Sequence, residues 1–208
     1  MRKLLLMVLL VLALPALTWA NSNNIVFQNS GGKITVGTGG SLQLKNSTLT
    51  SFTGLNGNTI SGTLGTVSFR TSGLALGSLG TSGTFAAGGS FTIMGNSASG
   101  IGSGVLFKGA FTGPVNWVGS FNPAGNHGLG AWTYVLSGTI TGNLSNGISV
   151  TAATVQFTFD VPNGKQFSNG VRLNQGSTTV TVPEPGTLGL LGTGLFGLAG
   201  LVRRRLSI

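Results

Sequence analysis

Alternating apolar and polar residues run through the body of this 208-residue chain and constrain its fold more than any other feature. In the segment TVQFTFDV, residues 154–161, every second residue is apolar, and a similar period recurs in AWTYVLSGTI at 131–140 and TVSFR at 66–70. Such a period places the apolar side chains on one face of a β-strand, so the pattern predicts an all-β body. Residue pairs that tolerate the positive φ of tight turns separate these runs: Asn56-Gly57, Asn146-Gly147, Asn163-Gly164, Asn169-Gly170 and Gly39-Gly40.

The separation of apolar and polar faces also favours a particular arrangement of the strands. Strands of this kind are typical of antiparallel sheets that pack on a common core. We therefore expect a single β-sandwich, jelly-roll-like domain over residues 21–182, with NQGSTTVTV at 174–182 as its last short strand. A β-solenoid is the alternative, because closely spaced strands rich in Gly, Asn and Thr are typical of it, although the sequence has no repeat of fixed length.

The charge of the chain is strongly positive but unevenly placed. Eleven Lys and Arg stand against two acidic residues, a formal charge of +9, and such a balance suggests nucleic acid or an anionic surface as partner. Many of the basic residues, however, lie near the two chain ends. Within residues 21–182 the remaining ones are scattered singly against one carboxylate, Asp160, and form no basic stripe, so we expect no nucleic-acid binding but at most a mild attraction to acidic polysaccharide. They are Lys33, Lys45, Arg70, Lys108, Lys165 and Arg172.

The N-terminus has the three parts of a signal peptide. Arg2 and Lys3 form a basic region, residues 4–14 form an apolar core, and small residues precede a cleavage point after Ala20. We expect signal peptidase to remove residues 1–20. An uncleaved membrane anchor is the alternative, but the apolar run is short for the ~20 residues that a membrane-spanning helix needs.

A second apolar stretch, residues 186–202, lies near the C-terminus and is followed by Arg203, Arg204 and Arg205. Seventeen residues at ~1.5 Å rise reach about 25 Å, which makes a marginal membrane helix. Basic residues remain on the cytoplasmic side, so the arginines would hold the body outside. This topology agrees with the N-terminal signal.

The last 26 residues resemble the PEP-CTERM sorting domain. Pro183, Glu184 and Pro185 match its signature, residues 187–202 its helix, and Arg203–Arg205 its basic tail. The resemblance implies recognition by an exosortase, removal of a transient membrane helix, and delivery to the cell surface or exopolysaccharide (biofilm) matrix of a Gram-negative bacterium. Proline lacks an N–H and favours extended backbone, which would keep the triplet open to a protease. A plain C-terminal anchor is the alternative.

The body lacks the residue sets that common enzymes use. Glycoside hydrolysis usually needs two carboxylates, and residues 21–182 have only Asp160. The single histidine, His127, lies in the predicted loop FNPAGNHGLGAW without a nucleophile-elbow motif nearby. The chain has no cysteine, and one carboxylate makes a strong calcium site improbable. We expect no enzymatic activity, no cofactor and no metal site.

Aromatic residues are the remaining sign of binding. Trp117, Trp132 and Tyr134 flank the loop around His127, and exposed rings could stack on sugars with Asn116, Asn122 and Asn126 as hydrogen-bonding partners. The alternative is that these rings fill the core, which is where aromatic side chains usually lie. The sequence thus predicts a non-enzymatic, exported surface or matrix protein associated with exopolysaccharide, with a carbohydrate-binding module as the second hypothesis.

Overall fold

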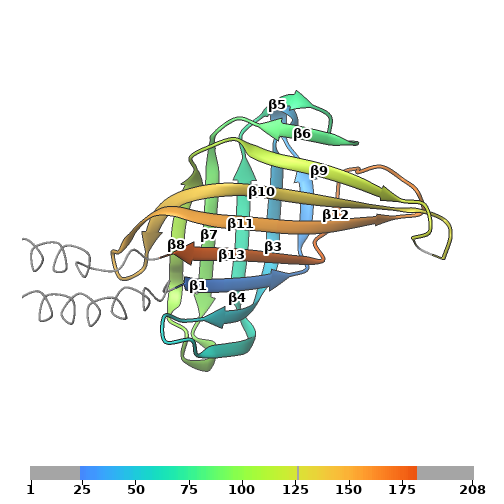
Figure 1. Cartoon of the computed structure of the whole chain (residues 1–208). Coiled ribbons are helices and arrows are strands. Elements are labelled where there is room, and N and C mark those ends of the chain that lie inside the picture. The colour runs from blue at the N-terminus through green and yellow to red at the C-terminus, as the bar shows by residue number, and fades with distance from the viewer. Residues whose placement is uncertain (1–23, 126, 182–208) are drawn as a thin grey trace, which may run out of the picture. The chain divides into compact units, whose positions relative to one another are not determined.

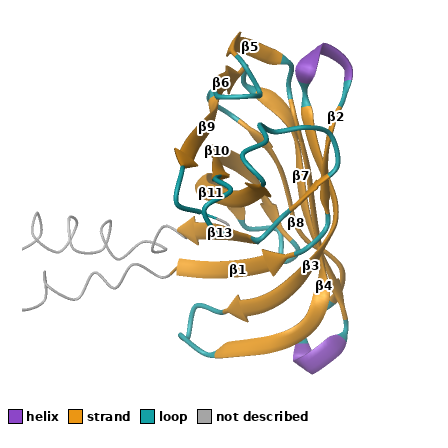
Figure 2. Cartoon of the chain, turned by 90° about the vertical axis from the view of Figure 1, so that its right-hand side faces the viewer, coloured by secondary structure: helices purple, strands orange, loops and turns teal. Residues whose placement is uncertain are grey.

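Strands make up nearly all the regular structure in the computed structural model of the chain, which describes residues 24–125 and 127–181 (Figures 1 and 2). Two short 3-10 turns, η2 (Thr38–Gly40) and η3 (Ala98–Gly100), are the other regular elements in this part of the chain. The strands are β1 (Asn24–Ser30), β2 (Lys33–Val36), β3 (Leu42–Thr53), β4 (Thr59–Thr71), β5 (Leu74–Gly77), β6 (Ser82–Phe85), β7 (Gly88–Asn96), β8 (Ser103–Phe111), β9 (Val115–Asn122), β10 (Ala131–Leu144), β11 (Ser149–Pro162), β12 (Val171–Arg172) and β13 (Gln175–Thr181).

Eight of these strands form one closed, barrel-like sheet. The order runs β11-β13-β1-β3-β4-β7-β8-β10, and pairing of β10 with β11 joins its two ends. Every pairing is antiparallel, which confirms the all-β, antiparallel prediction. The predicted sandwich is replaced by a single sheet that curls until its edges meet, and the solenoid alternative is not supported.

Bulges and glycines explain why the sheet closes instead of splitting into two layers. The register shifts within β1–β3, β3–β4, β7–β8 and β10–β11, and such irregularities bend a strand and increase its twist. At Gly65 in β4, φ is +152° and a Cβ would overlap the carbonyl oxygen of Met94 on β7. A residue with a side chain could not follow this path, so glycine permits the curvature.

The turn pairs predicted from the sequence lie between strands. Gly57 has a φ of +75° in the β3–β4 turn and Gly147 a φ of +83° in the β10–β11 turn. Alternation also gives the correct faces: Phe157 and Phe159 are buried, whereas Thr154, Gln156 and Asp160 are exposed.

Four phenylalanine rings form the centre of the closed sheet. Phe69 and Phe157 lie 4.8 Å apart, and Phe91 and Phe111 pack around them at 6.2–6.4 Å. All four side chains are at most 2% exposed. The inward faces of strands from every part of the chain therefore share one apolar core.

Three further strands branch from the closed sheet at β10. Residues 131–137 of β10 pair with β9, and residues 140–144 pair with β8. Beyond β9 the order continues through β6 to β5, while β2 and β12 pair with each other beside β3. β9 and the part of β10 that pairs with it carry a second group of aromatic side chains.

The first and last described strands are neighbours in the closed sheet. β13 lies between β11 and β1 (Figure 1), and Asn24 pairs with Thr181. Residues 24–181 form one compact unit. The predicted signal peptide and the sorting tail, with its helix at 186–202, lie outside the described residues. Among residues 24–125 and 127–181, no helix has the length and apolar character needed to cross a membrane.

Candidate functional site

Two of the three predicted glycan-contact residues are interior residues. Trp117 on β9 and Tyr134 on β10 are both 0% exposed, and their rings stack 4.9 Å apart at 14°. The alternation that marks these strands turns both rings toward the core face, and Phe167, from the segment between β11 and β12, covers them edge-on. Neither ring has a free face for a sugar, so the core interpretation is correct for both.

Main-chain groups of two loops bind the polar ends of these buried rings. Trp117 Nε1 donates to the Leu79 carbonyl at 3.0 Å, and the Tyr134 hydroxyl donates to the Gly80 carbonyl at 2.7 Å. The N–H of Phe167 in turn donates to the Tyr134 hydroxyl at 2.9 Å. Burial raises the pKa of Tyr134 and outweighs the opposite effect of the Phe167 N–H, so the phenol stays protonated.

Trp132 is only half-buried and pairs with a residue that the sequence did not single out. Its ring lies 5.3 Å from that of Phe121, which is directly opposite on β9 and 47% exposed. Trp132 also stacks on Tyr134 at 5.7 Å. The aromatic row thus runs from the buried Trp117 to an exposed end at Phe121 and Trp132. Alternation on β9 places Phe121 on the same face as Trp117, which is the signal that could have found it.

The asparagines proposed to accompany these rings do not gather around them. Asn116 is exposed on β9 and alternates with Trp117, so it lies on the opposite face of the strand. The Oδ1 of Asn122 accepts from the N–H of Ala124 at 3.1 Å in the turn after β9. Asn126 lies outside the described residues.

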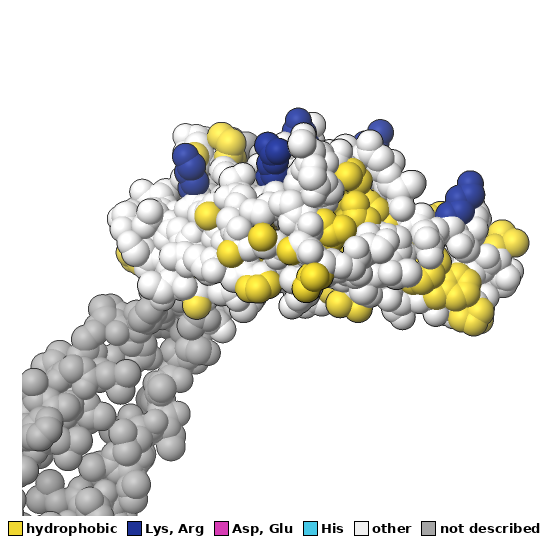
Figure 3. All heavy atoms as spheres, turned by 90° about the horizontal axis from the view of Figure 1, so that it is seen from above, with side chains coloured by type: hydrophobic (Ala, Val, Ile, Leu, Met, Phe, Trp, Pro, Cys, Tyr) yellow, Lys and Arg dark blue, Asp and Glu magenta, His cyan; other side chains and the backbone are white. Residues whose placement is uncertain are grey.

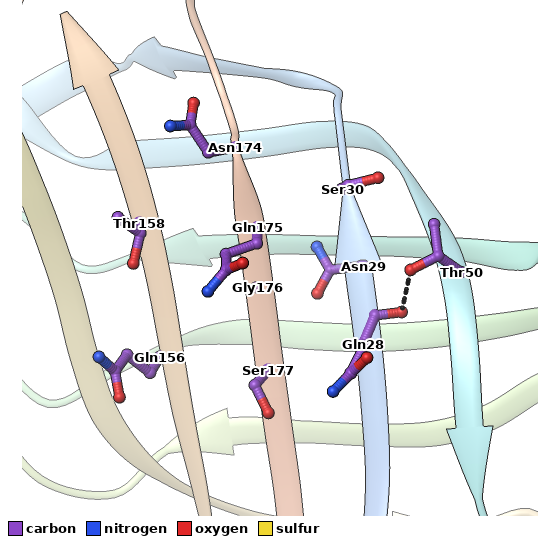
Figure 4. A pocket seen from close by; sticks show the side chains of 10 residues that line it. All are labelled: Gln28, Asn29, Ser30, Thr50, Gln156, Thr158, Asn174, Gln175, Gly176 and Ser177. Atoms are coloured by element: carbon purple, nitrogen blue, oxygen red, sulfur yellow. Dashed lines mark hydrogen bonds between the residues drawn. The ribbon is translucent and has the colours of Figure 1, made fainter. Parts of the chain in front are cut away.

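A polar groove crosses the outer face of four strands, β11, β13, β1 and β3 (Figure 4). It encloses about 420 Å³, and amide and hydroxyl side chains dominate its lining. Local sequence motifs did not predict it, because its strands lie far apart in the sequence. The lining residues are Gln28, Asn29, Ser30, Thr50, Gln156, Thr158, Asn174, Gln175, Gly176 and Ser177.

Strand register aligns the central groove residues. Ser177 on β13 lies opposite Gln156 on β11 and Gln28 on β1, and all three are on the outward face in Figure 4. Beneath them, Gly176 turns inward, where the Phe157 ring and the Asn29 Oδ1 occupy the space that a Cβ would need. The apolar core thus reaches directly under the polar groove.

Asp160 and His127 do not form a catalytic pair. Asp160 accepts from the Thr133 hydroxyl at 2.7 Å and from the Asn174 side-chain amide. His127 is exposed in the turn between β9 and β10, with a φ of +56°. Among the described residues no hydrogen bond or ion pair joins the two, and no group of three His, Asp, Glu or Cys side chains could hold a metal ion.

Figure 3 shows lysines and arginines on one face of the molecule. Strand register brings three basic residues together, because Lys33 on β2 lies opposite Arg172 on β12 and opposite Lys45 on β3. All three are exposed, so basic residues that are isolated in the sequence form a short row across neighbouring strands, which the sequence did not predict.

Comparison with protein families identifies the C-terminal segment. The model of the PEP-CTERM protein-sorting motif matches residues 181–205, which include Pro183–Pro185 and Arg203–Arg205. The resemblance found in the sequence is thereby confirmed, and the motif indicates an exported protein that an exosortase sorts. Neither the curated proteins nor the solved structures gave a match to the chain.

Proposed function

We propose that the processed protein is a non-enzymatic component of the cell surface or extracellular matrix of a Gram-negative bacterium, associated with exopolysaccharide. The observation that carries this proposal is the position of the sorting motif. The match begins at residue 181, and β13, the last strand of the closed sheet, ends at Thr181. Cleavage near Pro183–Pro185 would therefore remove none of the described strands and leave the closed sheet whole.

The pairing of the first and last strands supports cleavage at both ends. Asn24 lies opposite Thr181, so the predicted signal peptidase site after Ala20 and the Pro183–Pro185 triplet are each only a few residues along the chain from this strand pair. Removal of both segments leaves every described strand with its partners. The membrane contact of the tail would then be temporary.

The polar chemistry of the body supports a binding or structural role over catalysis. Asp160 is hydrogen-bonded to two other side chains, and within the described residues no hydrogen bond joins it to His127. A triad requires its base to be oriented by an acid and to contact a nucleophile. Neither contact is present at His127 among the described residues, so a triad mechanism has no support there, and the proposed role needs neither a cofactor nor a metal.

Association with exopolysaccharide is supported by the hydrogen-bonding, largely uncharged side chains on the outward faces of β11 and β13. Outward positions of β11 and β13 carry Thr, Gln and Ser in place of Lys and Glu. Such side chains offer both donors and acceptors to sugar hydroxyls. A carbohydrate-binding module that uses aromatic rings is the second candidate, and the exposed end of the aromatic row at Phe121 and Trp132 favours it.

Mass spectrometry of surface protein from the native host tests the processing. We expect an N-terminus at Asn21 and a C-terminus near Pro183–Pro185. Glu184→Ala should leave a larger, membrane-held form, whereas Thr187→Ala, outside the triplet, should be processed normally. Recovery of surface protein that still ends at Ile208 would refute the processing.

Digestion of the matrix polysaccharide tests the association with exopolysaccharide. It should release the wild-type protein from the cell surface. Retention of the protein after complete digestion would refute the association.

A further inference from the structure

We propose that the groove over β11, β13, β1 and β3 binds a neutral, hydroxyl-rich glycan; this inference rests on the proposed function and names the class of polysaccharide and its site. The groove differs from the other hollows of the described surface in the density of its amide side chains, five of its ten lining residues being Asn or Gln (Figure 4). Its volume of about 420 Å³ lies within the ~300–1,000 Å³ range of small-molecule sites.

The chemistry of the lining selects the ligand class. A carboxamide presents an acceptor oxygen and a donor nitrogen side by side, and a sugar hydroxyl can serve both. Within residues 24–125 and 127–181, the side-chain amides of Gln28, Gln156 and Gln175 make no hydrogen bond to protein. These three exposed side chains are therefore available to a ligand.

The geometry of the sheet gives the groove its width. Gln156 and Gln28 lie on either side of Ser177, two strand spacings apart. At ~4.8 Å per strand the two glutamines stand about 10 Å apart at the backbone, with the short serine between them. The short Ser177 side chain leaves a low point between the two glutamines, and Gln175, two residues away on the same strand, lies beside it.

The groove lining carries no charged side chain. This argues against an acidic glycan as the ligand, although the positive net charge of the protein would favour one. None of the ten lining residues is Lys, Arg, Asp or Glu. The carboxylate of Asp160 lies just beyond the groove, bound to the lining residue Asn174. An acidic sugar would meet this carboxylate without a cation in the groove to offset it, and desolvating an unpaired charge is unfavourable. A neutral glycan meets no such penalty.

Binding assays on the protein recovered from the host, in whichever processed form it is found, test the proposal. The probes are neutral gluco-, manno- and galacto-oligosaccharides, with acidic alginate oligosaccharides as the charged comparison. We expect wild-type protein to bind at least one neutral series, with little change between low and high salt, because no ion pair contributes. The triple variant Gln28→Ala, Gln156→Ala, Gln175→Ala should lose about tenfold or more in affinity, since several hydrogen bonds disappear together.

Matched variants separate the groove from other surfaces. Asn116→Ala and Gln166→Ala remove exposed amides elsewhere and should leave binding unchanged. Phe121→Ala with Trp132→Ala removes the aromatic pair and should also leave it unchanged. An unaltered thermal midpoint would show that the triple variant is folded.

Three outcomes would overturn the proposal: equal binding by the triple variant, loss of binding only in the aromatic variant, or binding confined to alginate and abolished by salt. Failure to bind any neutral glycan would overturn it as well. In that case normal processing and surface location of the same protein would show that the proposed function had not failed with it.

Discussion

The two aromatic clusters of this domain are built on different principles. In the closed sheet, Phe69, Phe91, Phe111 and Phe157 fill the centre without any polar atom that needs a partner. Beside it, Trp117 and Tyr134 are equally buried, but each depends on a main-chain group from a loop. Each strand that carries the first cluster is hydrogen-bonded to a neighbouring strand on both sides. The second cluster also requires that the loops at residues 78–81 and 163–170 stay in place. We expect the first to determine global stability and the second to determine local order.

The largest effect should follow from Phe157→Ala. The ring contacts Phe69 and Phe91 and lies beneath Gly176, so its removal leaves a cavity that rigid strands cannot fill. We expect a loss of about 3–5 kcal/mol in the free energy of unfolding, measured by denaturant titration. Thr158→Ala, on the outward face of the same strand, should change it by less than about 0.5 kcal/mol. A loss below about 1 kcal/mol at Phe157 would contradict a phenylalanine core that governs the fold.

A smaller, local effect should follow from Tyr134→Phe. The change keeps the stacked ring but leaves the Gly80 carbonyl and the Phe167 N–H without their partner. Unpaired buried groups cost about 1–3 kcal/mol. Hydrogen exchange should become faster at main-chain amides within residues 163–170 and stay unchanged in β7. Uniformly faster exchange across the closed sheet would show that the two clusters act as one cooperative unit.

The smallest effect should appear only at high pH. The pKa of Tyr134 in the folded protein lies above the ordinary value of 10.0. The protonated phenol therefore contributes its full stability below about pH 10, and this contribution is lost as the pH rises through the folded-state pKa. Tyr134 is the only tyrosine of the chain, so tyrosinate absorbance reports on it alone.

The absorbance of the folded protein should rise at higher pH than that of the unfolded chain. Tyr134→Phe should show a weaker loss of stability above pH 10 than the wild type, which separates the phenol from the lysines that titrate in the same range. Equal midpoints of the tyrosinate titration for folded and unfolded protein would mean that water reaches the Tyr134 ring.

Strand faces were predictable from the sequence because they follow from local alternation, as at Phe157 and Gln156. Strand partners were not, because alternation does not say which strand lies beside which. The sandwich was expected for that reason, and closure depends on β1 meeting β13 from the other end of the domain. The groove has the same origin: Gln28 and Gln156 become neighbours of Ser177 only through this pairing. The burial of Trp117 was foreseen as an alternative, but the loop that covers it carries no local signal.

The position of β13 also sets an order on the maturation of the protein. The strand that seals the sheet is the last of the described strands to be made, so β1 and β11 each keep one unpaired edge until residues 175–181 have been exported. Such edges are where chains aggregate, and long-range strand pairing is slow. The sorting motif follows the sealing strand directly in the chain. A nascent molecule therefore cannot expose its sorting motif outside the membrane before all the strands of the closed sheet have been exported.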